Sequence, residues 1–218
     1  MAFIARYVGG RLANFINQPV VGYEPISNYL ESTPLQTCDI VLVEGDFRIS
    51  TAIKYLTQST WSHAAMCVGD DLLIEADVER GVIIVPKSKY FKYNTRVCRP
   101  VGLSDAEKLQ VINLVSHRLG HQYDLKNIFD LARYLWPMPL VPTSWRRGLL
   151  ALGSGDPTKA ICSTLLAEAF EEVRFPILPP PVQGSCRGAG YTYITPRDFD
   201  VSPYFDIVKP HHPRQGQV

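Results

Sequence analysis

Three side chains of this sequence carry the groups of an activated sulfur nucleophile: a thiol, an imidazole and a carboxylate. The thiol is that of Cys162, the imidazole that of His63, and the carboxylate that of Glu75. An imidazole can take the proton of a thiol, and a carboxylate can fix the tautomer and orientation of the imidazole. The three residue types therefore predict a base, an orienting acid and a nucleophile, in that order along the chain.

Neighbouring strands of one hairpin are predicted to bring His63 and Glu75 together. Two runs rich in apolar residues, 63–68 and 72–76, flank a Gly-Asp-Asp segment that is typical of a hairpin turn. Side chains alternate between the faces of a strand, so Glu75 and Asp77 project to the same face. We expect Glu75 to contact His63 if the runs pair across the turn, and Asp77 to take its place if the register shifts by one pair.

The segment that begins with Cys162 has apolar residues at helical spacing. The later residues of this stripe are Leu165, Leu166, Ala169, Phe170 and Val173. In one interpretation Cys162 is a core residue on a buried face. In the other it lies in the first turn, where free N–H groups and the helix dipole favour a thiolate and can hold an oxyanion. We expect the helix to start near Ala160; a start at Asp156-Pro157 would put Cys162 in the second turn and weaken the effect.

Hydrophobic patterns predict the elements that must hold these three residues. The other expected strands are 39–43, 81–85, 96–99 and short pieces near Tyr191 and Phe205, and a short helix is expected at 50–58. A capping box of Ser104 and Glu107 begins a helix that continues to Gly120, and Asp124 begins a second helix that Pro137 ends. This mixture predicts a single α+β domain.

Residues 1–35 are expected to form an extension to a catalytic domain of residues 36–218. Apolar residues at helical spacing within 1–16 predict a helix that packs on the domain or, alternatively, makes a peripheral membrane contact. The long segment 136–158 is irregular and unusually apolar, and loops of this length often carry function.

Composition excludes several other classes of protein. A net charge of +1 gives no reason to expect nucleic acid as a partner, and 46% hydrophobic with 20% charged residues indicates a folded chain. No apolar run approaches the roughly 18 residues of a membrane-spanning helix, and the first residues lack the pattern of a signal peptide. We therefore expect a cytoplasmic location.

Neither the cysteines nor the histidines form a complete set of metal ligands in the sequence. The five cysteines include no Cys-x-x-Cys pair, which argues against a disulfide framework and a zinc site. Cys67 and Cys98 lie in apolar runs and are expected to be buried. His117 and His121 are four residues apart, but no glutamate follows His117 and no third ligand is apparent. We expect neither a metal nor another cofactor.

Six short segments, taken together, are more informative than any one motif. They are Asp39-Ile40-Val41-Leu42-Val43, Thr60-Trp61-Ser62-His63, Ile74-Glu75-Ala76, Gly120-His121-Gln122-Tyr123-Asp124, Ile161-Cys162-Ser163 and Thr195-Pro196-Arg197-Asp198-Phe199. In this order they resemble the permuted papain-like cysteine amidases of the YiiX/YebB type, relatives of the NlpC-type cell-wall peptidases and of lecithin retinol acyltransferase. The order of base and nucleophile is the reverse of that in papain-type chains, as permutation requires.

The resemblance implies a circularly permuted papain-like fold, in which an antiparallel sheet packs on the helix of the nucleophile. It also implies roles: Cys162 as nucleophile, His63 as base and Glu75 as the third member, with Tyr123 placed near the site. The chain departs from the family at Cys38, where glycine commonly precedes the aspartate.

Three further residues are expected to support the site or bind substrate: Ser62, Ser163 and Asp77.

Two other departures from the family follow the nucleophile, where Thr164 and Leu166 replace the more usual Glu and Val. Neither changes the three residues of the triad.

These observations predict a cysteine hydrolase that cleaves an amide bond, as in a peptide or a peptidoglycan fragment, through an acyl-enzyme. One alternative is an acyl-lipid hydrolase, acyltransferase or thioesterase with the same triad, for which the apolar segment 135–141 and the N-terminal residues would contact lipid. The other alternative is a binding module that keeps the fold without catalysis.

Overall fold

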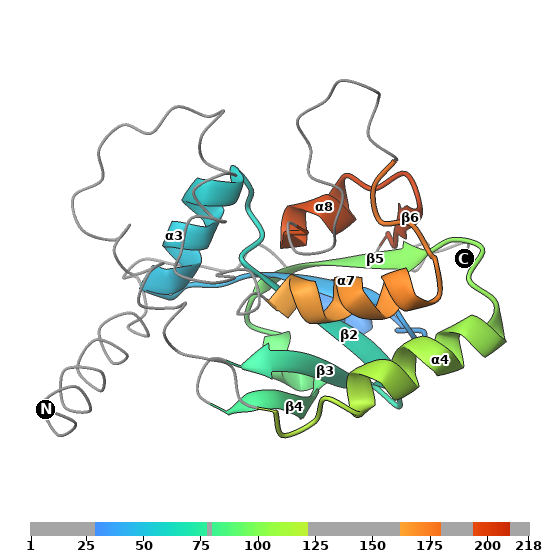
Figure 1. Ribbon diagram of the computed structural model, residues 1–218. Helices are drawn as coiled ribbons and strands as arrows, with labels where there is room; N and C mark the ends of the chain where they lie inside the picture. The colour runs from blue at the N-terminus through green and yellow to red at the C-terminus, as the bar shows by residue number, and fades with distance from the viewer. Residues whose placement is uncertain (1–28, 78–79, 122–161, 180–193, 210–218) are drawn as a thin grey trace, which may run out of the picture.

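A six-stranded antiparallel sheet, with the strand order β4-β3-β2-β1-β5-β6, is the centre of the computed structural model (Figure 1). The structure describes residues 29–77, 80–121, 162–179 and 194–209. The strands are β1 (Ile40–Glu44), β2 (His63–Gly69), β3 (Leu72–Asp77), β4 (Gly81–Pro86), β5 (Asn94–Pro100) and β6 (Phe205–Ile207). The expected α+β class with an antiparallel sheet is thus confirmed.

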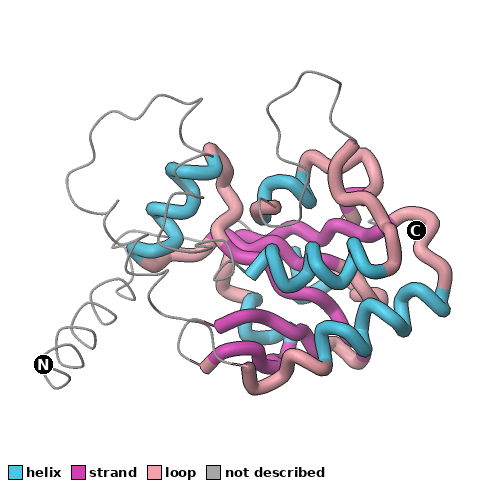
Figure 2. The backbone as a smooth tube through the Cα atoms, viewed as in Figure 1, coloured by secondary structure: helices cyan, strands magenta, loops and turns pink. Residues whose placement is uncertain are grey.

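Helices cover both faces of this sheet (Figure 2). They are α2 (Tyr29–Ser32), α3 (Arg48–Thr57), the 3-10 helix η1 (Lys87–Tyr90), α4 (Asp105–Ser116), α7 (Cys162–Glu172) and α8 (Pro196–Asp200). Figure 1 shows α4 and α7 side by side on one face, and α7 contacts both β2 and β3. On the other face, α2 contacts β5 and η1.

Alternation along the strands divides the core into two layers, one on each side of the sheet. The α7 layer contains buried side chains of α4, α7 and α8 with Ile40, Leu42, Ala64, Met66, Ile74 and Ala76 of the strands. The η1 layer contains Leu30 of α2 and Tyr90 of η1 with Val41, Val43, Ala65, Cys67, Leu73, Val85 and Val97. Central strands that are buried on both faces read as continuous apolar runs, as β1 does here.

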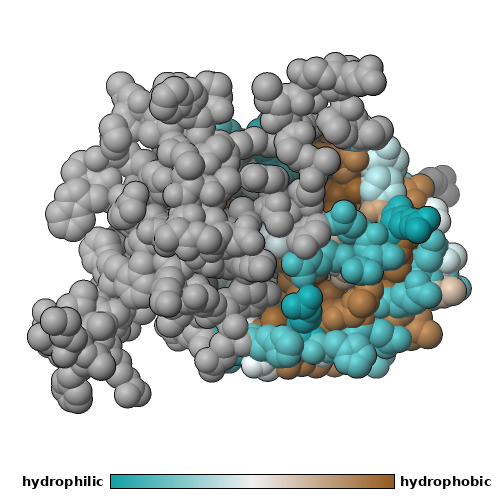
Figure 3. All heavy atoms as spheres, viewed as in Figure 1, coloured by the Kyte–Doolittle hydropathy of each residue, from teal (hydrophilic) through white to brown (hydrophobic). Residues whose placement is uncertain are grey.

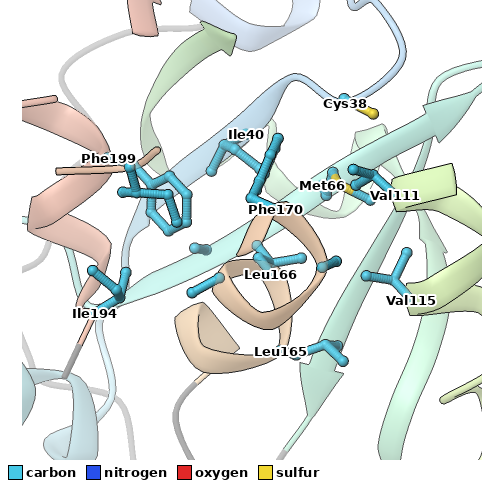
Figure 4. Packing of buried hydrophobic residues seen from close by; sticks show 14 of the residues in the cluster. Cys38, Ile40, Met66, Val111, Val115, Leu165, Leu166, Phe170, Ile194 and Phe199 are labelled. Atoms are coloured by element: carbon cyan, nitrogen blue, oxygen red, sulfur yellow. The ribbon is translucent and has the colours of Figure 1, made fainter. Parts of the chain in front are cut away.

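In the α7 layer, Leu166 and Phe170 of α7 point toward the strands and are fully buried (Figure 4). The ring of Phe170 lies 6.4 Å from that of Phe199 in α8 and 5.5 Å from that of Phe205 in β6, measured between centroids. These contacts fix α7 against the last elements of the chain.

The turn between β2 and β3 forms as the sequence predicts. Asp70 and Asp71 both have positive φ angles, 49° and 55°, which two-residue hairpin turns require to match the twist of the strands. A bulge between Cys67 and Gly69 precedes the turn. Met66 pairs with Ile74 across the hairpin, so β2 and β3 have a defined register.

Cys38 adopts the backbone conformation for which glycine is favoured, with a φ of 69°. Its N–H donates to the carbonyl of Cys67 at 2.8 Å, and the next residue, Asp39, is fully buried. The carboxylate of Asp39 accepts two hydrogen bonds from Arg99, at 2.8 and 2.7 Å, and one from the N–H of Gln36 at 2.7 Å. These bonds hold the turn before β1 although a side chain occupies the glycine position.

Two expected helix boundaries are wrong by a few residues. The helix expected at 50–58 is α3, which begins at Arg48 and ends at Thr57. The helix with the confirmed capping box of Ser104 and Glu107 ends at Ser116 instead of continuing to Gly120. Gly120 has a φ of 77° and its N–H donates to the carbonyl of Val82, so a bond to β4 takes the chain out of the helix.

The stripe expected on the helix of Cys162 is wider than predicted. Leu165, Leu166, Ala169 and Phe170 are buried as expected, but Ser163, Thr164 and Ala167 are buried too. The first described turns of α7 are therefore enclosed on more than one side. The other expectations for structure, the helix from Asp124, the segment 136–158, the strand near Tyr191 and the helix within 1–16, lie outside the described residues.

The described surface on the α4 and α7 side mixes apolar and polar residues (Figure 3). Leu109 and Leu114 of α4 are exposed, while Val111 and Val115 of the same helix are buried in the α7 layer. The 3.6-residue period of a helix explains this division.

Gly45 provides a test of the packing between β1, α3 and β2. A Cβ atom at this position would lie 2.3 Å from Ser50 Oγ, 3.0 Å from Ser50 Cβ and 2.9 Å from Ser62 Oγ. We predict that Gly45→Ala lowers the free energy of unfolding by about 1–3 kcal/mol, the usual cost of overpacking a core, as measured by urea denaturation. In a double-mutant cycle, Ser50→Ala should recover part of this loss. An unchanged urea midpoint for Gly45→Ala would contradict the packing described.

Candidate functional site

His63 and Glu75 lie together at the end of the hairpin formed by β2 and β3. The Nε2 atom of His63, the first residue of β2, is 3.1 Å from the Oε2 atom of Glu75 on β3. The register pairs Met66 with Ile74, so Glu75 reaches His63 diagonally across the two strands, a distance that a long side chain spans.

The carboxylate of Glu75 is 1% exposed and is bound by three different side chains. Oε2 accepts hydrogen bonds from His63 and from the hydroxyl of Tyr90, and Oε1 forms an ion pair with the ammonium of Lys89. Lys89 and Tyr90 both belong to η1, which follows β4 directly. A buried carboxylate is costly unless it is paired and hydrogen-bonded, and here both oxygen atoms have partners.

The electrostatic surroundings keep Glu75 ionised. Burial by itself raises the pKa of this carboxyl group, because it disfavours the charged form. The hydrogen bonds and charges of His63 and Lys89 act in the opposite direction and outweigh burial, so the pKa of Glu75 is lowered from its ordinary value. The site therefore contains a stable anion beside an imidazole.

The imidazole of His63 is partly open to solvent, with 24% of its side chain exposed. Its ring lies 6.0 Å from that of Tyr90, between centroids, and the two planes are tilted by 42°. Because Nε2 contacts Glu75, Nδ1 is the nitrogen that does not contact this carboxylate. An anion beside one nitrogen fixes the tautomer and orients the other nitrogen for proton transfer.

Cys162 is the first described residue of α7, so the expected start of this helix near Ala160 and the position of the Cys162 thiol lie outside what the structure describes. In Figure 1, α7 begins toward the same end of the sheet as β2. The helix packs on the side of Ala64 and Met66, whereas His63 and Glu75 alternate with these residues and project toward η1. A contact between Cys162 and His63 would therefore pass around the end of β2, where His63 is the first residue.

Three other residues expected at the site form their described hydrogen bonds with backbone groups, and not with His63 or Glu75. Ser62 Oγ accepts a hydrogen bond from the N–H of Gly45 at 2.9 Å, and Ser163 Oγ donates to the carbonyl of Ile194 at 2.7 Å. Asp77 accepts a hydrogen bond from the N–H of Arg80 at 2.9 Å. Tyr123 lies outside the described residues.

A polar cluster formed with α8 fixes the segment just before β2. The indole N–H of Trp61 donates to Asp200 Oδ2 at 2.9 Å, and Arg96 donates to Asp200 Oδ1 at 2.5 Å. The guanidinium of Arg96 also lies 5.1 Å from the centroid of the Trp61 ring, a cation–π distance. Trp61 stands two residues before His63, so this cluster positions the start of β2.

The motif at 195–199 gains a structural explanation from this arrangement. Thr195 and Asp198 form a capping box at the start of α8, with the N–H and the hydroxyl of Thr195 both donating to Asp198 at 2.8 Å. The box orients the short helix that carries Asp200. Sequence reasoning identified the motif but assigned it no contact.

Sequence reasoning also missed Lys89 and Tyr90. Both lie in a single turn of 3-10 helix, which is too short to give a periodic signal. A lysine next to a tyrosine after a strand does not by itself indicate that either side chain turns back to a carboxylate on another strand.

Three cysteines are buried, and their surroundings make them poorly reactive. Burial raises the pKa of Cys38 and of Cys98 to about 12, and it raises the pKa of Cys67 as well. A thiol reacts as its thiolate, so these side chains are chemically silent near neutral pH. The expectation that Cys67 and Cys98 are buried is confirmed, and Cys186 lies outside the described residues.

Within the described ranges, no group of three or more His, Cys, Asp or Glu side chains is close enough to hold a metal ion. The helices of the same ranges include none long and apolar enough to cross a membrane.

Comparisons with known proteins find structural likeness among solved structures. No family model and no curated protein sequence matches the chain. The crystal structure of the metalloprotein yiiX from Escherichia coli O157:H7 is similar with 15% sequence identity and a TM-score of 0.44, over 88% of this chain and 100% of that one. A likeness of this size leaves the function to be inferred from the residues of the site themselves.

The lowered pKa of Glu75 gives a prediction for stability against pH. A carboxyl group whose pKa is lower in the folded state stabilises the protein above its ordinary pKa of 4.5, and this contribution is lost as the pH falls through the folded pKa. We predict that Glu75→Gln lowers the free energy of unfolding at pH 7 by about 1.5–3 kcal/mol, the range for hydrogen bonds to charged groups. The variant should also lose less stability than the wild type between pH 5 and pH 3, since it lacks the titrating group.

Urea denaturation at a series of pH values measures both effects. Glu171→Gln, a change at an exposed glutamate of α7, is the matched control and should keep the wild-type pH dependence. Equal acid sensitivity of Glu75→Gln and the wild type would show that Glu75 is not a significant source of this stability.

Proposed function

We propose that the protein is a cysteine hydrolase that cleaves an amide bond, with Cys162 as nucleophile, His63 as base and Glu75 as the acid that orients the base. The observation that carries the proposal is the hydrogen bond of His63 Nε2 to a buried, ionised Glu75. The contacts of α7, whose described part begins at Cys162, with β2 and β3 support it. We also propose that the fold is the permuted papain-like arrangement, since five of the six strands, β1 to β5, precede the helix of the nucleophile in the chain.

The proposed reaction has two halves. His63 takes the proton of Cys162, and the sulfur forms a bond to the carbonyl carbon of the substrate. The tetrahedral intermediate collapses as the C–N bond breaks, and the imidazolium gives its proton to the leaving amine. Water, deprotonated by the same imidazole, then attacks the thioester, and the acid product leaves as Cys162 is regenerated.

The proposal places Cys162 in the first turn of its helix, because a helix start supplies the groups that this chemistry needs. Backbone N–H groups at a helix start have no partner within the helix, and the helix dipole favours negative charge there. Both effects stabilise a thiolate and an oxyanion beside it. Ser163, whose Oγ is tied to the carbonyl of Ile194, anchors this turn in the core.

Glu75 has a restricted role in this scheme. Its carboxylate stays ionised throughout, keeps the proton of neutral His63 on Nε2 and so presents Nδ1 to the thiol. The lowered pKa of Glu75 agrees with a residue that orients and does not itself accept the proton.

We predict that Cys162→Ala abolishes hydrolysis of amide substrates, because no other group replaces the sulfur in the covalent step. His63→Ala should lower kcat/KM at least about 100-fold, the lower range for general base catalysis. The assay uses a panel of aminoacyl and peptidyl amides, with thioesters and acyl lipids as the alternative substrates. Intact-mass spectrometry should detect an acylated wild-type enzyme.

Cys67→Ala is the matched control, since Cys67 is buried in the η1 layer with a raised pKa and should not affect turnover. Turnover that survives in Cys162→Ala would refute the proposed mechanism. Turnover of thioesters or acyl lipids alone would keep the triad and refute the amide as substrate. A protein that turns over none of these substrates would favour the binding module instead.

A further inference from the structure

We propose that Lys89 is a positioning residue that keeps His63 available as a base, by neutralising part of the charge that Glu75 presents to the imidazole. The catalytic meaning of this inference rests on the proposed function, whereas its physical content concerns the proton affinity of His63 alone.

The geometry makes Glu75 the link between a cation and the imidazole. Its carboxylate is almost completely buried, with Lys89 on Oε1 and His63 and Tyr90 on Oε2. The ammonium of Lys89 also lies 5.1 Å from the centroid of the Tyr90 ring. Lys89 therefore has two contacts that hold it on the far oxygen of the carboxylate.

A carboxylate beside an imidazole favours the protonated, charged form of the imidazole. An orienting acid thus has a cost, because an imidazole that holds its proton too strongly is no longer a base near neutral pH. The positive charge of Lys89 on the same carboxylate opposes this stabilisation of the imidazolium. Glu75 can then fix the orientation of His63 through a hydrogen bond without a large increase in its proton affinity.

The other charged groups around His63 have cation or anion partners of their own. On β3, Asp77 forms an ion pair with Arg80 at 3.8 Å. On β1, Val43 pairs with His63, and the next residue, Glu44, forms an ion pair with Lys54 of α3 at 3.1 Å.

On η1, the ammonium of Lys87 is 3.1 Å from Asp71, while the uncharged hydroxyl of Tyr90 binds Glu75 beside His63. Among the described residues, Lys89 is thus the lysine or arginine that forms an ion pair with Glu75. This ion pair reduces the stabilisation that the carboxylate gives to protonated His63.

The experiment is an NMR titration of the His63 imidazole in protein that carries Cys162→Ala, with the signal assigned by its absence in His63→Gln. We predict that Lys89→Met raises the pKa of His63 by about one unit, or tenfold in proton affinity, the lower range for a nearby charge. Lys89→Arg keeps the charge and should keep the pKa. Lys92→Met removes an equal charge from an exposed position three residues further on, and is the matched control.

A shift in Lys89→Met no larger than that in Lys92→Met, or a shift to lower pKa, would overturn the inference. The side chain of Lys89 is one-third exposed, so methionine has room; if this variant does not fold, Lys89→Gln gives the same test. In enzyme with Cys162 intact, the acid limb of kcat/KM should also move to higher pH in Lys89→Met.

The two proposals fail separately. The titration uses protein without the thiol, so a raised His63 pKa in a protein that never turns over substrate would refute the proposed function alone. Turnover that depends on Cys162, together with an unchanged His63 pKa in Lys89→Met, would refute the role of Lys89 alone.

Discussion

The buried carboxylate of Glu75 is the constraint on which the arrangement of the site depends. A negative charge in the interior needs donors on both oxygen atoms, and here they come from two elements, β2 and η1. His63 stands at the first position of β2, and Lys89 and Tyr90 occupy the turn that follows β4. The carboxylate of Glu75 thus links the register of the β2–β3 hairpin to the path of the chain after β4.

A second set of contacts joins the late part of the sequence to the same end of the sheet. Asp200 of α8 binds Trp61 and Arg96, and Ser163 of α7 binds the carbonyl just before α8. Both parts of the proposed catalytic arrangement, the start of β2 and the first described turn of α7, therefore contact α8 or the residues just before it. One buried phenylalanine from each of α7, α8 and β6 packs against the other two, so these elements belong to one core.

The strands β1 to β5 and the pairing of β2 with β3 could be predicted because their signals are local. Apolar alternation and a Gly-Asp-Asp turn are enough to place Glu75 on the same face as His63, and the capping box of Ser104 is a four-residue pattern. The end of α4 could not be predicted in this way, because a bond between Gly120 and Val82, far apart in sequence, decides it. The burial of Ser163 on α7 likewise depends on a contact between distant parts of the chain, the hydrogen bond to the carbonyl of Ile194.

The contacts of Glu75 could also be predicted only in part from local sequence patterns. Sequence pattern indicates that a carboxylate on an apolar strand needs a partner, and it gives His63 as one. It does not give Lys89 or Tyr90, because a one-turn helix has no periodicity and their contact is made in three dimensions. The packing of α7 on β2 and β3 is likewise made between distant parts of the chain, and local patterns do not determine it.

The most direct test of an activated Cys162 is its rate of alkylation by iodoacetamide as a function of pH, with each site assigned by mass spectrometry. The proposed triad predicts that Cys162 reacts with an apparent pKa well below the ordinary value of about 8.5, and that His63→Ala removes this reactivity at pH 6. Cys38 and Cys98, whose pKa values burial raises to about 12, are unreactive internal references in the same sample. An apparent pKa of Cys162 at or above the ordinary value, unchanged in His63→Ala, would contradict the pairing of thiol and imidazole.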